Sequence, residues 1–151
     1  MNHLINIARS ADPGPGVQFR LQAYGASAID SFLRDVLSLA NASISGPRYI
    51  VVGVGFDGSG ERQVSGIDTS DFAGKPGYAA LAHEFIEPPL RIHYHAISVV
   101  GKRVGVFEIG DCQDRPYMMR IDYSETLRRG DAYKQSGELS IKMGRQQLMQ
   151  L

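Results

Sequence analysis

The sequence has little of what several protein classes require. It holds one cysteine, Cys112, in 151 residues, which excludes an intrachain disulfide and a cysteine-rich zinc site. Its 16 basic side chains equal its 16 acidic ones, so net charge argues for no particular partner. No apolar run approaches the roughly 18 residues of a membrane span, and the first residues lack the pattern of a signal peptide. We therefore expect a cytoplasmic protein that does not contact a membrane.

The two halves of the chain nevertheless differ in charge. Residues 1–90 carry 6 basic and 9 acidic side chains, whereas residues 91–151 carry 10 basic and 7 acidic ones. This asymmetry predicts a basic surface in the C-terminal half, diluted there by several acids. The cations of the last third are interleaved with tyrosines, and arginine can grip phosphate while tyrosine can stack on bases. The cations are Arg120, Arg128, Arg129, Lys134, Lys142 and Arg145, and the tyrosines are Tyr117, Tyr123 and Tyr133.

The length predicts one domain, which we expect at residues 17–151. The Asp-Pro-Gly-Pro-Gly break at 12–16 marks residues 1–16 as a peripheral segment. Alternating residues predict a strand at 17–21. Apolar residues at helical spacing predict a helix at 29–40 that ends before Gly46-Pro47. Its predicted outward residues are Asp30, Arg34, Asp35 and Ser38.

The remaining elements follow from similar patterns. The continuous apolar run at 49–54 predicts a central strand covered on both faces, and strands at 91–100 and 103–109 form a predicted hairpin around Gly101-Lys102. Short strands are expected at 63–67, 118–123 and 125–129, and helices at 71–86 and 140–151. The predicted fold is α+β: a single compact domain with a mixed, mostly antiparallel sheet flanked by two to three helices.

No local motif supports catalysis or a cofactor. His93 and His95 have a spacing that could chelate a metal, but a third ligand is not evident. Cys112 has no partner histidine to form a thiolate. The glycine-rich segment 53–60 continues into a strand rather than a helix, which favours a hairpin turn over a phosphate cradle. We predict no catalytic residue, no metal site and no cofactor.

Four blocks together resemble the Schlafen-type AlbA domain, a family described as DNA-binding domains of bacterial regulators and defence proteins. Residues 37–42 (LSLANA) resemble the family's "AxANxxGG", and residues 49–58 with 64–67 resemble "lliGVxDdG" and "vxG". Residues 104–117 resemble "vlvixVxxsxxxPy", and residues 126–131 resemble "yyxRxGsst". The resemblance implies the family's fold and contact with DNA or RNA.

The resemblance also bears on catalysis. In nuclease members, two glutamates around the first strand and an aspartate after the next central strand are thought to hold a metal. Here Gln18 occupies the glutamate position, and only Asp57 matches the aspartate. One carboxylate cannot hold a hard divalent ion well. The resemblance therefore implies a non-catalytic binding or regulatory module in which Arg128 and Arg129 contact phosphate. The supporting contacts would be Arg120, Lys134, Lys142, Arg20 and Arg48.

Two alternatives remain open. The chain could be a protein–protein or assembly module, acting as a homodimer or with a partner protein, that kept the fold and lost the ancestral site. It could also be a divergent metal-dependent nuclease that uses Asp57 with Glu84 or Glu87.

Overall fold

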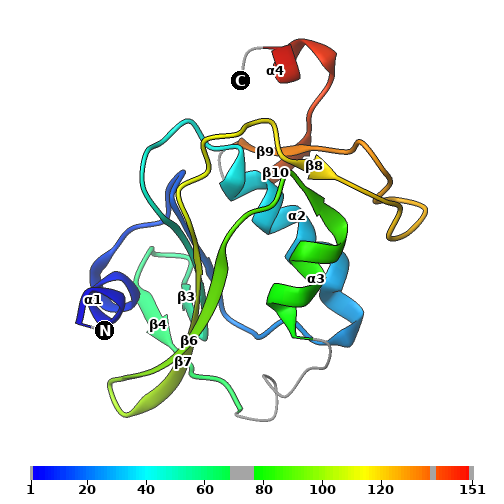
Figure 1. Ribbon diagram of the computed structural model, residues 1–151. Helices are drawn as coiled ribbons and strands as arrows, with labels where there is room; N and C mark the ends of the chain where they lie inside the picture. Colours follow the sequence, from blue (N-terminus) through cyan, green and yellow to red (C-terminus); the bar gives the residue numbers. More distant parts are fainter. Residues whose placement is uncertain (1, 69–76, 137–138, 150–151) are drawn as a thin grey trace.

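A four-stranded sheet forms the centre of the computed structural model, which describes residues 2–68, 77–136 and 139–149 (Figure 1). Its strands lie in the order β1 (Val17–Arg20), β2 (Arg48–Val52), β7 (Lys102–Ile109) and β6 (Ile92–Val99). The pair β1–β2 is parallel and the other two pairs are antiparallel. The prediction of a mixed, mostly antiparallel sheet in an α+β fold is confirmed.

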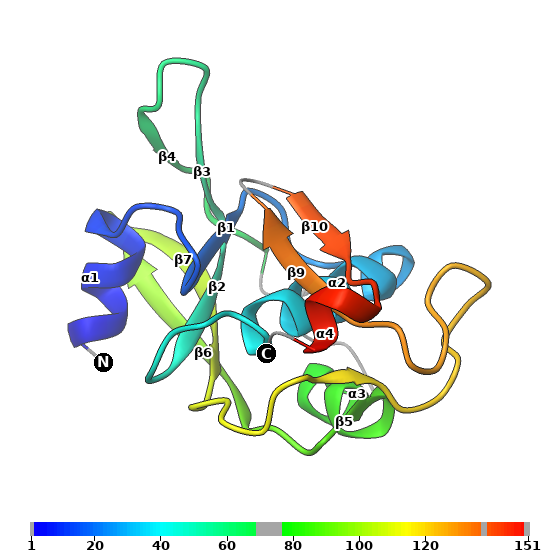
Figure 2. The same cartoon turned by 90° about the horizontal axis from the view of Figure 1, so that it is seen from above.

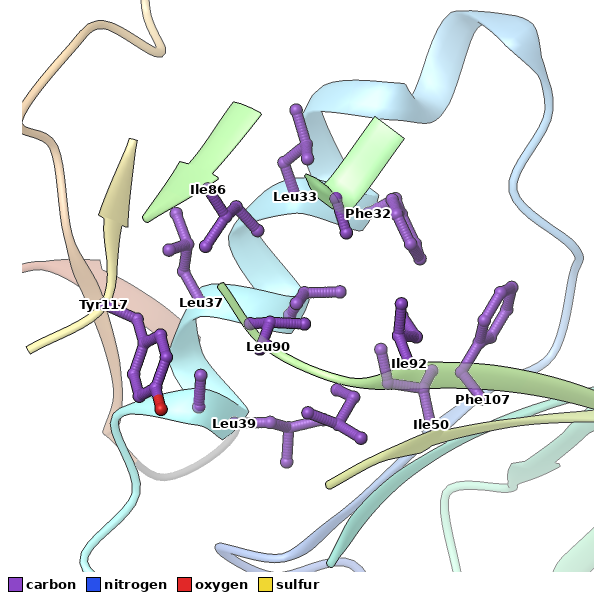
Figure 3. Packing of buried hydrophobic residues seen from close by; sticks show 14 of the residues in the cluster. Phe32, Leu33, Leu37, Leu39, Ile50, Ile86, Leu90, Ile92, Phe107 and Tyr117 are labelled. Atoms are coloured by element: carbon purple, nitrogen blue, oxygen red, sulfur yellow. The ribbon is translucent and has the colours of Figure 1, made fainter. Parts of the chain in front are cut away.

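Helices cover both faces of this sheet (Figure 2). A short 3₁₀ turn (Ala26–Ala28) leads into α2 (Ile29–Ala40), which shares one face with α3 (Tyr78–Phe85). As Figure 3 shows, Leu33 and Leu37 of α2 lie in one buried cluster with Ile50 and Phe107 of the sheet. The apolar stripe predicted for residues 29–40 is the face that packs here.

The opposite face is covered by α1 (Asn2–Ser10), which we had expected to be peripheral. Leu4 and Ala8 lie one helical turn apart and are 1% and 0% exposed, packed with Val51 and Val106 of the sheet. The break at 12–16 therefore separates α1 from β1 without separating it from the core.

The central strand β2 is buried along its whole length, as predicted. After it the chain bends at Gly53 and forms the hairpin of β3 (Val54–Phe56) and β4 (Arg62–Val64), which projects from the body (Figure 2). Gly53 has φ +100, and an added Cβ would lie 3.3 Å from the Gly66 backbone. The bend therefore requires glycine.

The C-terminal third is arranged differently from the prediction. β5 (Ile86–Glu87) pairs with β8 (Met118–Met119), and the segment predicted as a strand at 125–129 is a loop. A hairpin of β9 (Tyr133–Ser136) and β10 (Leu139–Lys142) packs on α2, followed by the short helix α4 (Arg145–Met149).

The helix predicted at 140–151 is thus wrong in its first half, because pairing with β9 overrides the local propensity. The predicted helix start at 71–76 lies outside the described residues. Among the described helices, none combines the length and the apolar character needed to cross a membrane.

Candidate nucleic-acid interface

The C-terminal end of α2 is anchored by Asn41, which is fully buried. Its Oδ1 accepts a hydrogen bond from the Tyr117 N–H (2.7 Å), and its Nδ2 donates to the carbonyls of Tyr117 (2.9 Å) and Tyr133 (3.0 Å). All three partners lie at least 76 residues away along the chain. Asn41 therefore fixes, relative to α2, both ends of the segment that carries Arg120, Arg128 and Arg129.

Arg48 does not belong to a binding surface, contrary to the prediction. Its side chain is fully buried, and its guanidinium donates to the carbonyls of Ala40 (3.4 Å), Ala42 (3.4 Å) and Ile44 (2.6 Å). These carbonyls end α2 and begin the following turn, where a cation compensates the helix dipole. Arg48 is a helix cap, out of reach of phosphate.

Residues 120–131 form an exposed loop that we name the basic loop. The backbone N–H of Arg129 donates to Asp122 Oδ1 (2.8 Å), and that of Arg128 donates to Asp131 Oδ2 (2.9 Å). The two carboxylates thus hold the backbone, while both arginine residues are exposed. In the described part of the chain, no ion pair joins either guanidinium to a carboxylate.

Tyr123 lies in the same loop, 36% exposed, with its ring 5.2 Å from that of Phe85. Arg120 begins the loop, and its Nε donates to the Glu84 carbonyl (2.9 Å). Lys142 approaches the loop from β10, where its Nζ lies 3.1 Å from Asp131 Oδ1. The structure therefore brings Arg120, Arg128, Arg129 and Lys142 to one loop, partly neutralised by its own acids.

The other two predicted cations lie elsewhere. Lys134 is exposed on β9, paired with Ile141 across the hairpin. Arg20 is half-buried on β1, with its guanidinium carbon 4.3 Å from the centroid of the Tyr24 ring. Its Nε is buried and has no hydrogen-bond partner in the described chain. Neither residue extends the basic loop.

A pocket of about 340 Å³ opens beside β1, between α2, β3 and the β9–β10 hairpin. Gln18 Nε2 donates to Gln135 Oε1 (3.3 Å) at its rim, and the Ser38 hydroxyl donates to Ser140 (2.8 Å) beside it. Gln18, Gln135 and Ser140 line the pocket together with Pro13, Val17, Phe19, Asp35, Gly55 and Phe56. We had predicted that Asp35 and Ser38 face solvent, but the hairpin covers this side of α2.

Asp35 is the acidic group of the pocket. Burial raises its pKa, although the Tyr24 hydroxyl bond and the charges of Arg20 and Arg34 act in the opposite direction. The Tyr24 hydroxyl donates to Asp35 Oδ2, and burial together with this carboxylate raises the pKa of Tyr24 well above its usual value. Neither Asp35 nor Gln135 was among the predicted site residues. No local signal marks them, because their neighbours in space come from distant segments.

The carboxylates proposed for a nuclease do not meet. Asp57 Oδ1 accepts bonds from the Ser59 N–H (2.9 Å) and hydroxyl (2.7 Å) and the Glu61 N–H (2.9 Å). The Ser59 hydroxyl bond, with the backbone bonds, lowers the pKa of Asp57. Asp57 thus builds the turn of the β3–β4 arm, away from α3 and its Glu84 (Figures 1 and 2). In the described segments, no three His, Cys, Asp or Glu side chains come together to hold a metal.

Comparisons with known proteins agree with this architecture. The sequence profile of the family described as Schlafen, AlbA_2 matches residues 17–144. The solution NMR structure of the N-terminal domain of a protein related to the ATP-dependent DNA helicase RecG, from Nitrosomonas europaea, is similar, with a TM-score of 0.55. The two chains are 18% identical, and the match covers 91% of this chain and 92% of the other. This likeness shows the fold. No curated protein sequence matches the chain.

Proposed function

Since the chain belongs to the Schlafen AlbA_2 family, we propose that it is a non-catalytic module that binds nucleic acid through the basic loop. The observation that carries the proposal is that Arg128 and Arg129 have a fixed backbone and exposed side chains. Their backbone N–H groups are tied to Asp131 and Asp122, while both residues are exposed. The loop backbone is thereby held, and exposed guanidinium groups suit the bidentate geometry of phosphate oxygens.

Other features of the loop support the same proposal. The partly exposed ring of Tyr123 offers a surface on which an unpaired base can stack. Arg120 and Lys142 add positive charge at the same loop. The similar solved domain comes from a protein described as related to a DNA helicase, which fits a role in handling polynucleotides.

The non-catalytic part of the proposal rests on the carboxylates. Gln18 offers an amide where a metal site would need a charged oxygen, and Asp57 is engaged in its own turn. Binding without cleavage is consistent with a regulatory role, on DNA or on RNA.

The test is fluorescence anisotropy with labelled single-stranded DNA, single-stranded RNA and duplex DNA. The double variant Arg128→Ala/Arg129→Ala keeps the loop, because the carboxylates bind backbone N–H groups. We expect it to bind about tenfold more weakly, a loss of about 1.4 kcal/mol. The matched control, Lys102→Ala/Arg103→Ala, removes two exposed neighbouring cations at the β6–β7 turn and should bind as the unmodified chain does.

Equal binding by the two double variants would contradict the assigned surface. No binding by the unmodified chain to any of the three probes, together with a stable oligomer in light scattering, would contradict the function. That outcome would favour the assembly module.

A further inference from the structure

We propose that the pocket beside β1 binds one unpaired nucleobase that carries an exocyclic amino group, from a strand held by the basic loop. The inference rests on the proposed function and adds a site for base recognition. Its physical basis is a pair of hydrogen-bond acceptors that have no donor among the described residues, beside two aromatic rings.

The two residues that carry these acceptors, Asp35 and Gln18, line the same pocket. Asp35 Oδ2 takes the Tyr24 hydroxyl, whereas Oδ1 has no donor among the described residues. The Gln18 amide donates through Nε2 to Gln135, and its carbonyl Oε1 has no donor within the same described part of the chain. Unfilled acceptors in a half-buried site favour a ligand that presents N–H groups.

That requirement selects among the bases. Adenine, cytosine and guanine each carry an exocyclic amino group, whereas thymine and uracil present one N–H between two carbonyls. The carbonyls would meet Asp35 Oδ1 and Gln18 Oε1 acceptor to acceptor. Thymine and uracil should therefore be disfavoured.

The aromatic side of the pocket suits a planar ligand. The rings of Phe19 and Phe56 lie 5.1 Å apart and perpendicular, so together they offer a face and an edge. The guanidinium carbon of Arg62 lies 5.2 and 4.8 Å from the two ring centroids, which fixes them from one side. Base stacking on such rings contributes about 1–3 kcal/mol.

Position and charge connect the pocket to the basic loop. Arg34 Nη2 donates to Thr126 Oγ1 of the loop (3.2 Å), and the next residue of α2, Asp35, lines the pocket. A carboxylate repels phosphate, so a strand with its phosphates on the loop would place a base, not its backbone, in the pocket. The volume of about 340 Å³ lies within the usual range of ligand pockets.

The first experiment compares the affinities of labelled oligo(dA), oligo(dC) and oligo(dT). We expect oligo(dA) and oligo(dC) to bind about tenfold more tightly than oligo(dT), as one good base contact allows. Asp35→Asn should remove this preference, because its amide oxygen takes the Tyr24 hydroxyl and its NH₂ group then faces the ligand. Gln18→Met removes the second acceptor and keeps a side chain of similar length. It should reduce the difference in affinity between oligo(dT) and the other two oligonucleotides. Arg128→Ala/Arg129→Ala should weaken all three equally.

The outcomes separate the two proposals. Equal affinities for the three oligonucleotides, or an Asp35→Asn variant with the same preference, would overturn the base pocket and leave the proposed function standing. If the unmodified chain binds none of them, the proposed function fails, and an NMR titration decides the pocket. Adenosine should then shift the Gln18 side-chain NH₂ signals and uridine should not. The absence of a shift with adenosine would overturn the inference.

Discussion

Asp35 shows how one residue can serve a site at the expense of stability. Burial raises its pKa above the ordinary 3.8, so the folded chain binds the proton more tightly than the unfolded chain does. The contribution of the protonated Asp35 carboxyl to stability is fully present below pH 3.8 and is lost as the pH rises through the folded-state pKa. At neutral pH the ionised carboxylate therefore opposes folding.

Asp35→Asn should consequently be more stable than the unmodified chain at pH 7, since the amide is neutral and still accepts the Tyr24 hydroxyl. The advantage should shrink as the pH falls toward 3.8 and below, where the native carboxyl is protonated too. Urea unfolding across this range measures it. An advantage independent of pH would contradict the assignment.

Asp57 provides a control of opposite sign. Its pKa is lowered by hydrogen bonds from Ser59 and its neighbours, so the ionised form stabilises the fold above the ordinary pKa. Asp57→Asn should therefore be less stable than the unmodified chain at neutral pH. That deficit should disappear as the pH falls through the folded-state pKa.

Among the elements, the end of α2 determines where the candidate site is held. Arg48 satisfies the carbonyls of the last turn, and Asn41 ties that turn to Tyr117 and Tyr133. The segment between these two tyrosines contains the basic loop. The Leu-Ala-Asn-Ala block in the sequence therefore has a structural reason: an amide at this position both accepts and donates.

Asn41→Asp tests this anchor with almost no change in size. The carboxylate can still accept from the Tyr117 N–H, but it cannot donate to the two carbonyls, which are left unsatisfied in the interior. At about 1–3 kcal/mol for each unsatisfied group, we expect a loss of about 3 kcal/mol or more in the free energy of unfolding. Denaturant titration measures it.

Asn6→Asp is the matched control for this change, because Asn6 is exposed on α1. It should alter the free energy of unfolding by no more than about 0.5 kcal/mol. A loss of similar size in both variants would contradict the anchoring role of Asn41.

For the whole molecule, local patterns could predict the scaffold but not the pocket. The burial of β2 and of the apolar stripe of α2 is predicted correctly because each follows from a pattern within its own segment. That pattern is a continuous apolar run in β2 and helical spacing in α2. The pocket depends instead on pairs far apart in the chain. Ser38 and Ser140 are separated by 102 residues, and Gln18 and Gln135 by 117. No window of sequence contains such a pair, so the side of α2 that they cover looked exposed.

The same limit explains two further differences. Arginine is usually exposed, so Arg48 looks like a surface cation in the sequence. In the structure the turn after α2 folds over it, and the carbonyls of that turn accept hydrogen bonds from the buried guanidinium. Residues 1–16 contain a strong break, yet Leu4 and Ala8 find an uncovered sheet face. In both cases the tertiary contacts override what the local sequence indicates.

The neutral total charge makes the salt dependence of binding a sharp test of where the contacts lie. Each phosphate contact on a single strand contributes about 0.7 to the slope of log affinity against log salt concentration. Arg128→Ala/Arg129→Ala should therefore reduce the slope by about 1.4, whereas Lys102→Ala/Arg103→Ala should leave it unchanged. Asp35→Asn should also keep the slope while changing the preference among bases, because a base contact releases no counterion. Slopes that respond equally to both double variants would indicate diffuse attraction over the whole surface rather than binding at the basic loop.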